Sequence, residues 1–416
     1  MIVTSLQLAN LRVIEAAEFH FQPGFNLIVG VNGVGKTSVL DALAVCLSGI
    51  VKYANGLRYR VRKFSPIDLR VGAEALTIQS KVQLDGREYT YLVHQPGETS
   101  VAEERKVRQP GKQVYDTPVR SEFIGDVPSR LAGSKEGLPL AMLFSTRRAL
   151  TTAREPSNMA AAGGIAAACA DAFTNRTLRF GEFAAWMRMQ HTLAAEQPSA
   201  KHVLASFGAA VSRFLPEYSN LRVDNGQSPQ LLIDRSAVPL PVAQLSDGER
   251  GTLSMVLDLT RRLAQANPTM KDPAAEAEAV VLIDEIELHL HPTWQRRIIK
   301  NLTDTFPKCQ FIATTHSPQI IGEVEHDQIQ IMANGEVYPP THSYGVDSSR
   351  VLEEIMDAYP RAEDIAVLLN EISGTIGDDR YDDARELLHD LSSRLGENDP
   401  EVTRIQTLLD FLAGEA

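Results

Sequence analysis

The sequence predicts an α/β protein whose central sheet is mixed but mainly parallel, with an antiparallel sheet at the N-terminal end. Continuous apolar runs bounded by helical patterns are typical of parallel strands buried on both faces. They occur at Phe25–Val29, Leu231–Ile233, Ala279–Ile283 and Gln310–Thr315. Alternating apolar and polar residues predict strands at 2–8, 17–21 and 76–95, and Asp85-Gly86 marks a hairpin turn within the last range.

Helices and loops are predicted between these strands. From Lys36 a helix buries Val39, Leu40, Leu43, Ala44 and Leu47 along one face. Residues 96–135 are polar and predict a loop, whereas 150–215 are rich in alanine and predict a helical insertion without coiled-coil heptads. A charged helical appendage is expected over 348–412, with a break at Asn398-Asp-Pro400.

The length and composition fit one large domain with appendages. With 416 residues, 44% of them hydrophobic, the chain can bury a substantial core. We expect an N-terminal lobe at 1–149, the insertion at 150–229, a C-terminal lobe at 230–340 and the appendage at 341–416. The three cysteines, Cys46, Cys169 and Cys309, are widely spaced, so neither a disulfide framework nor a zinc site is predicted. We expect Cys46 and Cys309 to be small residues of the core.

Charge and hydropathy restrict the location and the partners. The net charge of −12 argues against a surface that grips nucleic acid everywhere, so a DNA or RNA contact needs a local patch. Residues 52–63 form such a basic and aromatic segment, for which nucleic-acid binding and a solvated charge run are equally good interpretations: Lys52, Tyr53, Arg58, Tyr59, Arg60, Arg62 and Lys63. No signal peptide opens the chain and no stretch approaches the ~20 apolar residues of a membrane helix, so we expect a cytoplasmic protein without a membrane partner.

A phosphate-binding loop is predicted at Gly30–Thr37, which matches G-x-x-x-x-G-K-[ST] between a strand and a helix. Backbone N–H groups of such a loop surround a triphosphate, while the lysine neutralises it and the hydroxyl ligates Mg²⁺. The candidate ATP contacts are Gly30, Asn32, Gly33, Gly35, Lys36, Thr37 and Ser38, with Thr37 also a metal ligand.

Two acids, Asp284 and Glu285, close a buried apolar strand. Carboxylates at such a position are costly unless a cation or substrate balances them. We expect Asp284 in the Mg²⁺ shell and Glu285 as the base that polarises the attacking water. The alternative is a strand that ends at a solvated turn.

Ser246-Asp-Gly-Glu249 opens an amphipathic helix, and this motif has two interpretations. Ser246 and Glu249 fit a capping box, which is common in proteins. The free amides near Gly248 also form an anion seat at a helix N-terminus. The residues alone favour neither.

Two further groups have mainly structural interpretations. His289 and His291 alternate on extended chain, but no third His or Cys nearby supports a metal site. The acidic run at 378–383 predicts a solvated helix start rather than a metal site.

The order of these motifs resembles the SMC/RecF/OLD-like branch of ABC ATPases over about two-thirds of the chain. The match is carried by the phosphate loop, LSDGER at Leu245–Arg250, IDEIELHLHP at Ile283–Pro292 and TTHSP at Thr314–Pro318. With the tail Tyr344–Ile355, it is closest to the ATPase subunit of Septu-type and retron-associated antiphage systems. The fold implied is an ABC-type ATPase head with the helical insertion and appendage described above.

The resemblance implies roles for further residues. Ser246, Gly248 and Glu249 would cover ATP held by a second copy, so the site would be completed only in a homodimer. His316 would be the switch histidine that senses the γ-phosphate, and Leu290, His291 and Pro292 would lie near the dimer seam. The glutamine that relatives carry in a sensing loop is not evident, because Leu138–Arg148 has Ser145 and arginines instead.

The resemblance also implies a partner. Such ATPases work with a separately encoded HNH endonuclease, and the 76 residues after Pro340 are too few and too helical for the Toprim nuclease of OLD proteins. We therefore expect an ATP-hydrolysing subunit that dimerises around ATP and controls a nuclease in antiviral defence. The alternatives are a RecF/SMC-like DNA-repair clamp and a nucleotide-gated binding module with negligible turnover; a transporter ATPase fits least.

Overall fold

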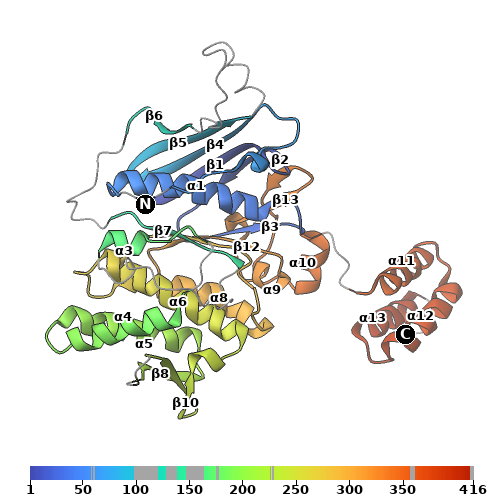
Figure 1. Cartoon of the computed structure of the whole chain (residues 1–416). Helices are drawn as coiled ribbons and strands as arrows, with labels where there is room; N and C mark the ends of the chain where they lie inside the picture. Colours follow the sequence, from blue (N-terminus) through green and yellow to red (C-terminus); the bar gives the residue numbers. More distant parts are fainter. Residues whose placement is uncertain are drawn as a thin grey trace. The chain divides into compact units, whose positions relative to one another are not determined.

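The protein consists of two compact units, Met1–Val346 and Asp347–Ala416, which are described separately. The computed structural model describes residues 1–57, 59, 61–97, 120–127, 138–146, 164–174, 178–224, 226, 229–356 and 361–412. Figure 1 shows the elements of both units.

The first sheet is antiparallel and uses the N-terminal strands. Its order is β2-β1-β4-β5-β6, with bounds Ile14–His20, Ile2–Leu11, Ala75–Leu84, Arg87–Pro96 and Arg120–Ile124. The predicted hairpin is confirmed, because Asp85 and Gly86 connect β4 to β5 with φ of 49° and 73°. Strand β6 corrects the prediction of a loop over 96–135; the rest of that range is described only at 97 and 125–127 besides Pro96 of β5.

The central sheet has the order β14-β13-β3-β12-β11-β7. The five strands from β13 to β7 pair in parallel, and β14 is antiparallel at the edge. Its strands are β3 (Phe25–Val29), β7 (Ala141–Phe144), β11 (Val280–Ile283), β12 (Gln310–Thr315), β13 (Ile329–Ala333) and β14 (Glu336–Tyr338). Every residue of β3, β7, β11 and β12 is buried, as parallel strands covered on both faces require. The predicted mixed, mainly parallel sheet is confirmed.

Helix α1 (Lys36–Ala54) lies between the two sheets, as Figure 1 shows. Helices α6 (Asp247–Ala266) and α8 (Pro292–Thr305) cover the opposite face of the central sheet. Of the described residues, α1 alone is long and apolar enough to cross a membrane, which corrects the prediction that no stretch approaches that length; its residues are mostly buried inside the unit.

The insertion combines helices with a third sheet. Helices α3 (Ile165–Cys169), α4 (Phe180–Leu193) and α5 (Pro198–Phe214) precede an antiparallel sheet of order β10-β9-β8. This sheet corrects two expectations: β8 (Tyr218–Val223) lies in a segment predicted to be helical, and β9 (Leu231–Arg235) does not join the central sheet. Strand β10 spans Val238–Pro241. Residues 150–163 of the predicted helical insertion lie outside the described residues.

Short helices complete the first unit, and the second unit is all helical where described. The short helices are α7 (Pro273–Glu276) and α9 (Pro318–Ile321). The second unit has α10 (Ser348–Glu354), α11 (Glu363–Gly377), α12 (Tyr381–Leu395) and α13 (Pro400–Leu412). Helices α11 to α13 share a small core that includes Ile372, Leu391 and Leu409. The break before Pro400 is confirmed, and the acidic run at 378–383 leads into α12 as predicted.

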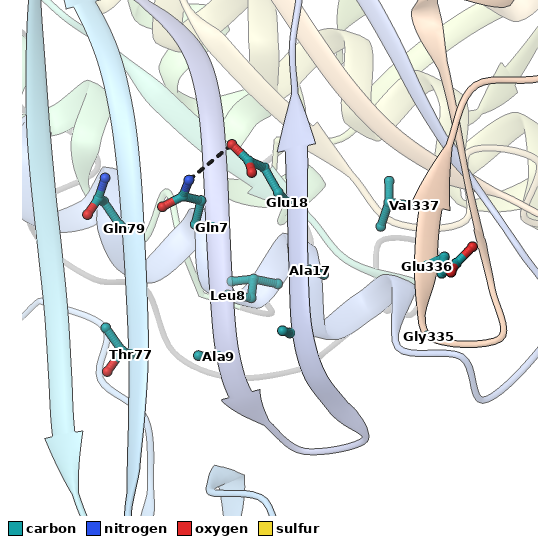
Figure 2. A pocket seen from close by; sticks show the side chains of 11 residues that line it. Gln7, Leu8, Ala9, Ala17, Glu18, Thr77, Gln79, Gly335, Glu336 and Val337 are labelled. Carbon is teal, nitrogen blue, oxygen red and sulfur yellow. Dashed lines mark hydrogen bonds between the residues drawn. The ribbon is translucent and has the colours of Figure 1, made fainter.

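An open groove of about 640 Å³ lies on the outer face of the N-terminal sheet. Figure 2 shows Gln7 of β1 donating to Glu18 of β2, with the β13–β14 turn at Gly335 and Glu336 on the far side. Ala9, Ala16 and Ala17 line this groove, and their small side chains cover little of the strand backbone. None of the residues predicted to bind nucleotide lines this groove.

Candidate functional site

The phosphate loop connects β3 to α1, and glycine is needed in it for two different reasons. Gly33 and Gly35 have φ of 86° and 109°, a region that residues with a Cβ rarely adopt. At Gly30 a Cβ would lie 2.7 Å from the Met332 carbonyl oxygen, so this glycine lets β13 pass close to the loop. The loop is thus shaped both locally and by the adjacent strand.

Lys36 is 8% exposed, and the loop's own carbonyls hold its ammonium. Nζ donates to the carbonyl oxygens of Gly30 at 2.6 Å and Val31 at 3.0 Å. Burial lowers the pKa of Lys36, and the negative charges of Glu287, Glu285 and Asp284 partly oppose this effect. A buried ammonium held by carbonyl oxygens can exchange those contacts for an anionic ligand, whereas the neighbouring carboxylates favour a bound cation.

Asp284 lies against the first turn of α1. Its carboxylate accepts from Thr37 Oγ1 at 3.1 and 3.3 Å and from Thr314 Oγ1 at 2.7 Å, and it is 4% exposed. A hydroxyl and a carboxylate together are the hard oxygen donors that Mg²⁺ prefers. The residues present therefore fit the metal that the loop motif implies, although no described group of three or more His, Cys, Asp or Glu forms a protein-only metal site.

Glu285 is held in a strained backbone conformation at the carboxyl edge of the sheet. Its φ is 45°, which is unfavourable for a residue with a side chain and costs about 1–3 kcal/mol. The Glu285 amide donates to Thr314 Oγ1 at 2.8 Å, which keeps the backbone in place. Strain of this kind clusters at functional sites, and here it sits at the predicted base.

Glu287 and His316 form a pair that the motif analysis did not identify. Glu287 Oε1 accepts from the His316 backbone amide at 2.7 Å and lies 3.1 Å from His316 Nδ1. Thr315 Oγ1 donates to Glu287 Oε2 at 2.8 Å. A third acid shortly after the acid pair, and two threonines ending the neighbouring buried strand, were the available signals.

The structure brings together Lys36, Thr37, Asp284, Glu285 and His316, because β3, β11 and β12 are neighbours whose carboxyl ends share one edge. Ser145 follows β7 at this same edge, where the Phe144 carbonyl accepts from the Asp284 amide at 2.9 Å. The segment predicted for the sensing loop is therefore adjacent to the acids, although Arg147 and Arg148 lie outside the described residues. Ser38 turns toward Arg12, whose Nη1 donates to its Oγ at 3.2 Å.

The helix start at Ser246 forms a capping box. Ser246 N and Oγ donate to Glu249 Oε2 at 2.8 and 2.7 Å, and Glu249 N donates back to Ser246 Oγ at 3.4 Å. Tyr218 Oη donates to Glu249 Oε1 at 2.7 Å. Burial raises the pKa of Glu249, but these hydrogen bonds outweigh it and the pKa is lowered. The capping interpretation thus describes the isolated chain.

Gly248 makes a backbone contact that the sequence did not indicate. A Cβ on Gly248 would lie 2.2 Å from the His289 carbonyl oxygen, so only glycine fits without a shift of the main chain. His289 has a φ of 61° and follows the acid-bearing strand. The N-terminus of α6 therefore contacts the loop that follows Asp284 and Glu285.

The basic segment at 52–63 is partly occupied by internal contacts. Arg62 pairs with Asp41 at 2.5 Å and donates to the Phe173 carbonyl at 3.1 Å. Tyr59 Oη donates to the Ser48 carbonyl at 2.8 Å, and burial raises the pKa of Tyr59. Arg58 and Arg60 lie outside the described residues. Of the described cations in the segment, Lys52 and Lys63 remain for a ligand.

Comparisons with known proteins find similar families, relatives and folds. Residues 5–160 match the family described as "AAA domain", and residues 172–322 match "AAA domain, putative AbiEii toxin, Type IV TA system". "Retron Ec83 probable ATPase" of Escherichia coli is 37% identical over 47% of this chain and 37% of its own length. "Septu protein PtuA" of Bacillus thuringiensis is 21% identical over 86% of this chain and 84% of that protein. The chain thus spans little more than a third of the retron relative.

A solved SMC head bound to the C-terminal winged-helix domain of ScpA matches the fold. Its TM-score is 0.50, with 14% identity over 82% of this chain and 98% of the head. The fold is thus that of an ABC-type ATPase head. By sequence, the chain is related to the retron and Septu ATPases.

Proposed function

We propose that this chain binds and hydrolyses ATP as a regulatory subunit, dimerises around the nucleotide and controls a separately encoded nuclease in antiviral defence. The observation that carries the proposal is the single edge where Lys36, Thr37, Asp284 and Glu285 meet. The family matches and the retron and Septu relatives support it.

The residues of one chain would perform the hydrolytic half of the work. Loop amides and Lys36 would hold the phosphates, and the oxygens of Thr37 and Asp284 would hold Mg²⁺, which neutralises phosphate charge in such sites. Glu285 would accept a hydrogen bond from the attacking water and orient it. His316 would contact the terminal phosphate.

The second copy would complete the site through the start of α6. Ser246 Oγ would leave its partner Glu249 and turn to the nucleotide of the other chain, while the amide at Gly248 would face the phosphate. Hydrolysis would remove the bridge and release the dimer. The capping box would thus be the resting state of this surface.

Two variants test the proposal. Glu285→Gln should bind ATP, hydrolyse it roughly a hundredfold more slowly and accumulate as a dimer, since only the charge that orients water is lost. Lys36→Ala should lose ATP binding. Phosphate release and light scattering with ATP measure both, with Glu336→Gln on exposed β14 as the control. Hydrolysis by Glu285→Gln at the wild-type rate would remove the assigned base.

Control of a nuclease is tested by co-expression with the adjacent reading frames. DNA cleavage by a co-purified partner should differ between the Glu285→Gln and Lys36→Ala forms, because one fixes the ATP-bound state and the other excludes it. Equal cleavage with both would contradict nucleotide control while leaving the ATPase activity in place.

A DNA-repair clamp is the second candidate, and the fold likeness to an SMC head favours it. That function needs a nucleic-acid surface on this chain, and Lys52 and Lys63 are the candidates for it among the described residues of the basic segment. Reversing both to glutamate should abolish DNA binding in a clamp and change little in a nuclease regulator. A gel-shift assay with duplex DNA distinguishes them. Negligible phosphate release by the wild type would instead support a nucleotide-gated binding module.

A further inference from the structure

We infer that Glu287 is a positioning residue for the switch histidine, fixing the direction and the protonation pattern of His316. The inference rests on the ATPase function proposed above and assigns a role to a carboxylate that the motifs leave unexplained. Glu287 is 7% exposed, and both of its oxygens are engaged. A carboxylate buried to this degree needs such partners to compensate its lost hydration.

The carboxylate beside Nδ1 determines which histidine nitrogen is available to a ligand. The Glu287 carboxylate lies 3.1 Å from Nδ1 as an ion-pair contact, and its negative charge favours a hydrogen on Nδ1 in the neutral ring, which leaves Nε2 as the acceptor. To donate to a phosphate oxygen, Nε2 must also be protonated. The resulting imidazolium would have the Glu287 charge directly behind it, as the orienting carboxylate of a catalytic triad does.

The Glu287 side chain is itself fixed by a closed ring of hydrogen bonds. Thr315 Oγ1 donates to Glu287 and accepts from Ser317 N at 3.0 Å, and Ser317 Oγ donates to Gln295 at 2.6 Å. Gln295 Nε2 donates to the Leu290 carbonyl at 2.9 Å, and Leu290 N donates to the Glu287 carbonyl at 2.8 Å. The ring joins the loop after β11 to the loop after β12, and the bond from the His316 amide to Glu287 ties the backbone at His316 to the acid-bearing loop.

Glu287 also acts on the phosphate-binding lysine. Among the three carboxylates that raise the pKa of Lys36 against the effect of burial, Glu287 has the largest influence. The same carboxylate therefore acts electrostatically on the lysine and contacts His316 directly. A side chain that only held the loop together by hydrogen bonds would not need a negative charge near Lys36 and His316.

The test separates this charge from the shape of the side chain. Glu287→Gln keeps an oxygen that can accept from the His316 amide but removes the charge behind the imidazole. We expect kcat for ATP hydrolysis to fall roughly tenfold to a hundredfold with KM within a few-fold of wild type, as when a partner that orients a functional histidine is lost. Glu323→Gln, which removes an exposed carboxylate paired with Arg296, is the matched control.

Two measurements keep the test decisive. The ¹⁵N chemical shifts of His316, assigned by their loss in His316→Gln, should show a hydrogen on Nδ1 in the wild type and a mixture of tautomers in Glu287→Gln. If Glu287→Gln kept wild-type kcat and tautomer while Lys36→Ala and Glu285→Gln behaved as proposed, Glu287 would be a loop staple and the ATPase function would stand. If those two variants had no effect either, the proposed function itself would fail.

Discussion

The two units of this protein differ most clearly in where their charge resides. Residues 347–416 contain 18 acidic and 6 basic residues, a net charge of −12 that equals that of the whole chain. Residues 1–346 contain 35 of each. The argument that net charge opposes extensive nucleic-acid binding therefore applies to the unit at 347–416, called the helical unit below. The unit at 1–346, called the ATPase unit after its proposed function, must be judged by its local surfaces.

Ion pairs are also used differently in the two units. In the ATPase unit, Arg12 and Arg62 both pair with Asp41 of α1, and buried Asp258 pairs with Arg261 and Arg262. Arg262 also donates to the carbonyls of Ala168 and Ala170, which ties α6 to α3 and the turn after it. The helical unit has mainly exposed pairs, several of them one helical turn apart, such as Arg394 with Asp390. The ion pairs named for the first unit are buried or half-buried, whereas most of those in the second unit are exposed.

Among the variants that compare the two units, Gly248→Ala in the first unit should have the largest effect. The added methyl group must displace the His289 carbonyl, which lies 2.2 Å from its position, so the loop from Glu285 to Leu290 has to shift. We expect at least a tenfold loss of phosphate release. Gly208→Ala in α5, where a Cβ meets nothing within 4 Å, is the matched control. Normal turnover by Gly248→Ala would show that the contact does not constrain the site.

A smaller effect should follow from Asp258→Asn. The two arginines outweigh the effect of burial and hold the pKa of Asp258 at about 2, below its ordinary 3.8, which corresponds to about 2–3 kcal/mol of stability at pH 7. Because the folded pKa is lowered, this contribution is complete above pH ~4 and disappears as the pH falls toward ~2. Urea unfolding at several pH values should show the difference between wild type and variant shrinking over that range.

Removing an acidic partner from an exposed ion pair of the helical unit should change its stability very little. Asp390→Asn removes an exposed pair with Arg394, whose side chains are both 45% exposed, and should change stability by less than about 0.5 kcal/mol. A loss as large as that of Asp258→Asn would contradict the distinction between buried and exposed ion pairs.

The smallest effect should be a gain. Gly374 lies within α11 with no atom within 4 Å of an added Cβ, so Gly374→Ala should stabilise the helical unit by about 0.5–1 kcal/mol. Both tryptophans, Trp186 and Trp294, lie in the ATPase unit. Helical circular dichroism should therefore register the gain, while tryptophan fluorescence should report an unchanged transition. A shift in both signals would show that the units unfold together.

Most of the fold could be predicted because its signals are local. The glycine loop between β3 and α1, the Asp85-Gly86 hairpin and the break before Pro400 each depend on a few adjacent residues. Strand β9 was assigned to the wrong sheet because an apolar run does not indicate its partner. Strand β6 was missed because its five residues are mostly exposed and polar.

The candidate site was predictable to the same degree. Lys36 and Asp284 could be paired from motif order, but the Glu287–His316 contact depends on β11 and β12 being neighbours. The Gly248 contact depends on how α6 meets the loop after β11. The spacing of residues along the sequence therefore predicts neither the Glu287–His316 contact nor the Gly248–His289 contact.

The hydrogen-bond ring through Glu287 has a consequence for how such sequences diverge. Thr315 is fully buried, so its hydroxyl would have to find another acceptor if Glu287 became apolar, at a cost of about 1–3 kcal/mol. Substitutions at Glu287, Thr315, Ser317 and Gln295 should then occur together in related chains rather than one at a time. The four positions would then evolve as one unit, and a related protein with a different residue at one of them should also differ at the others.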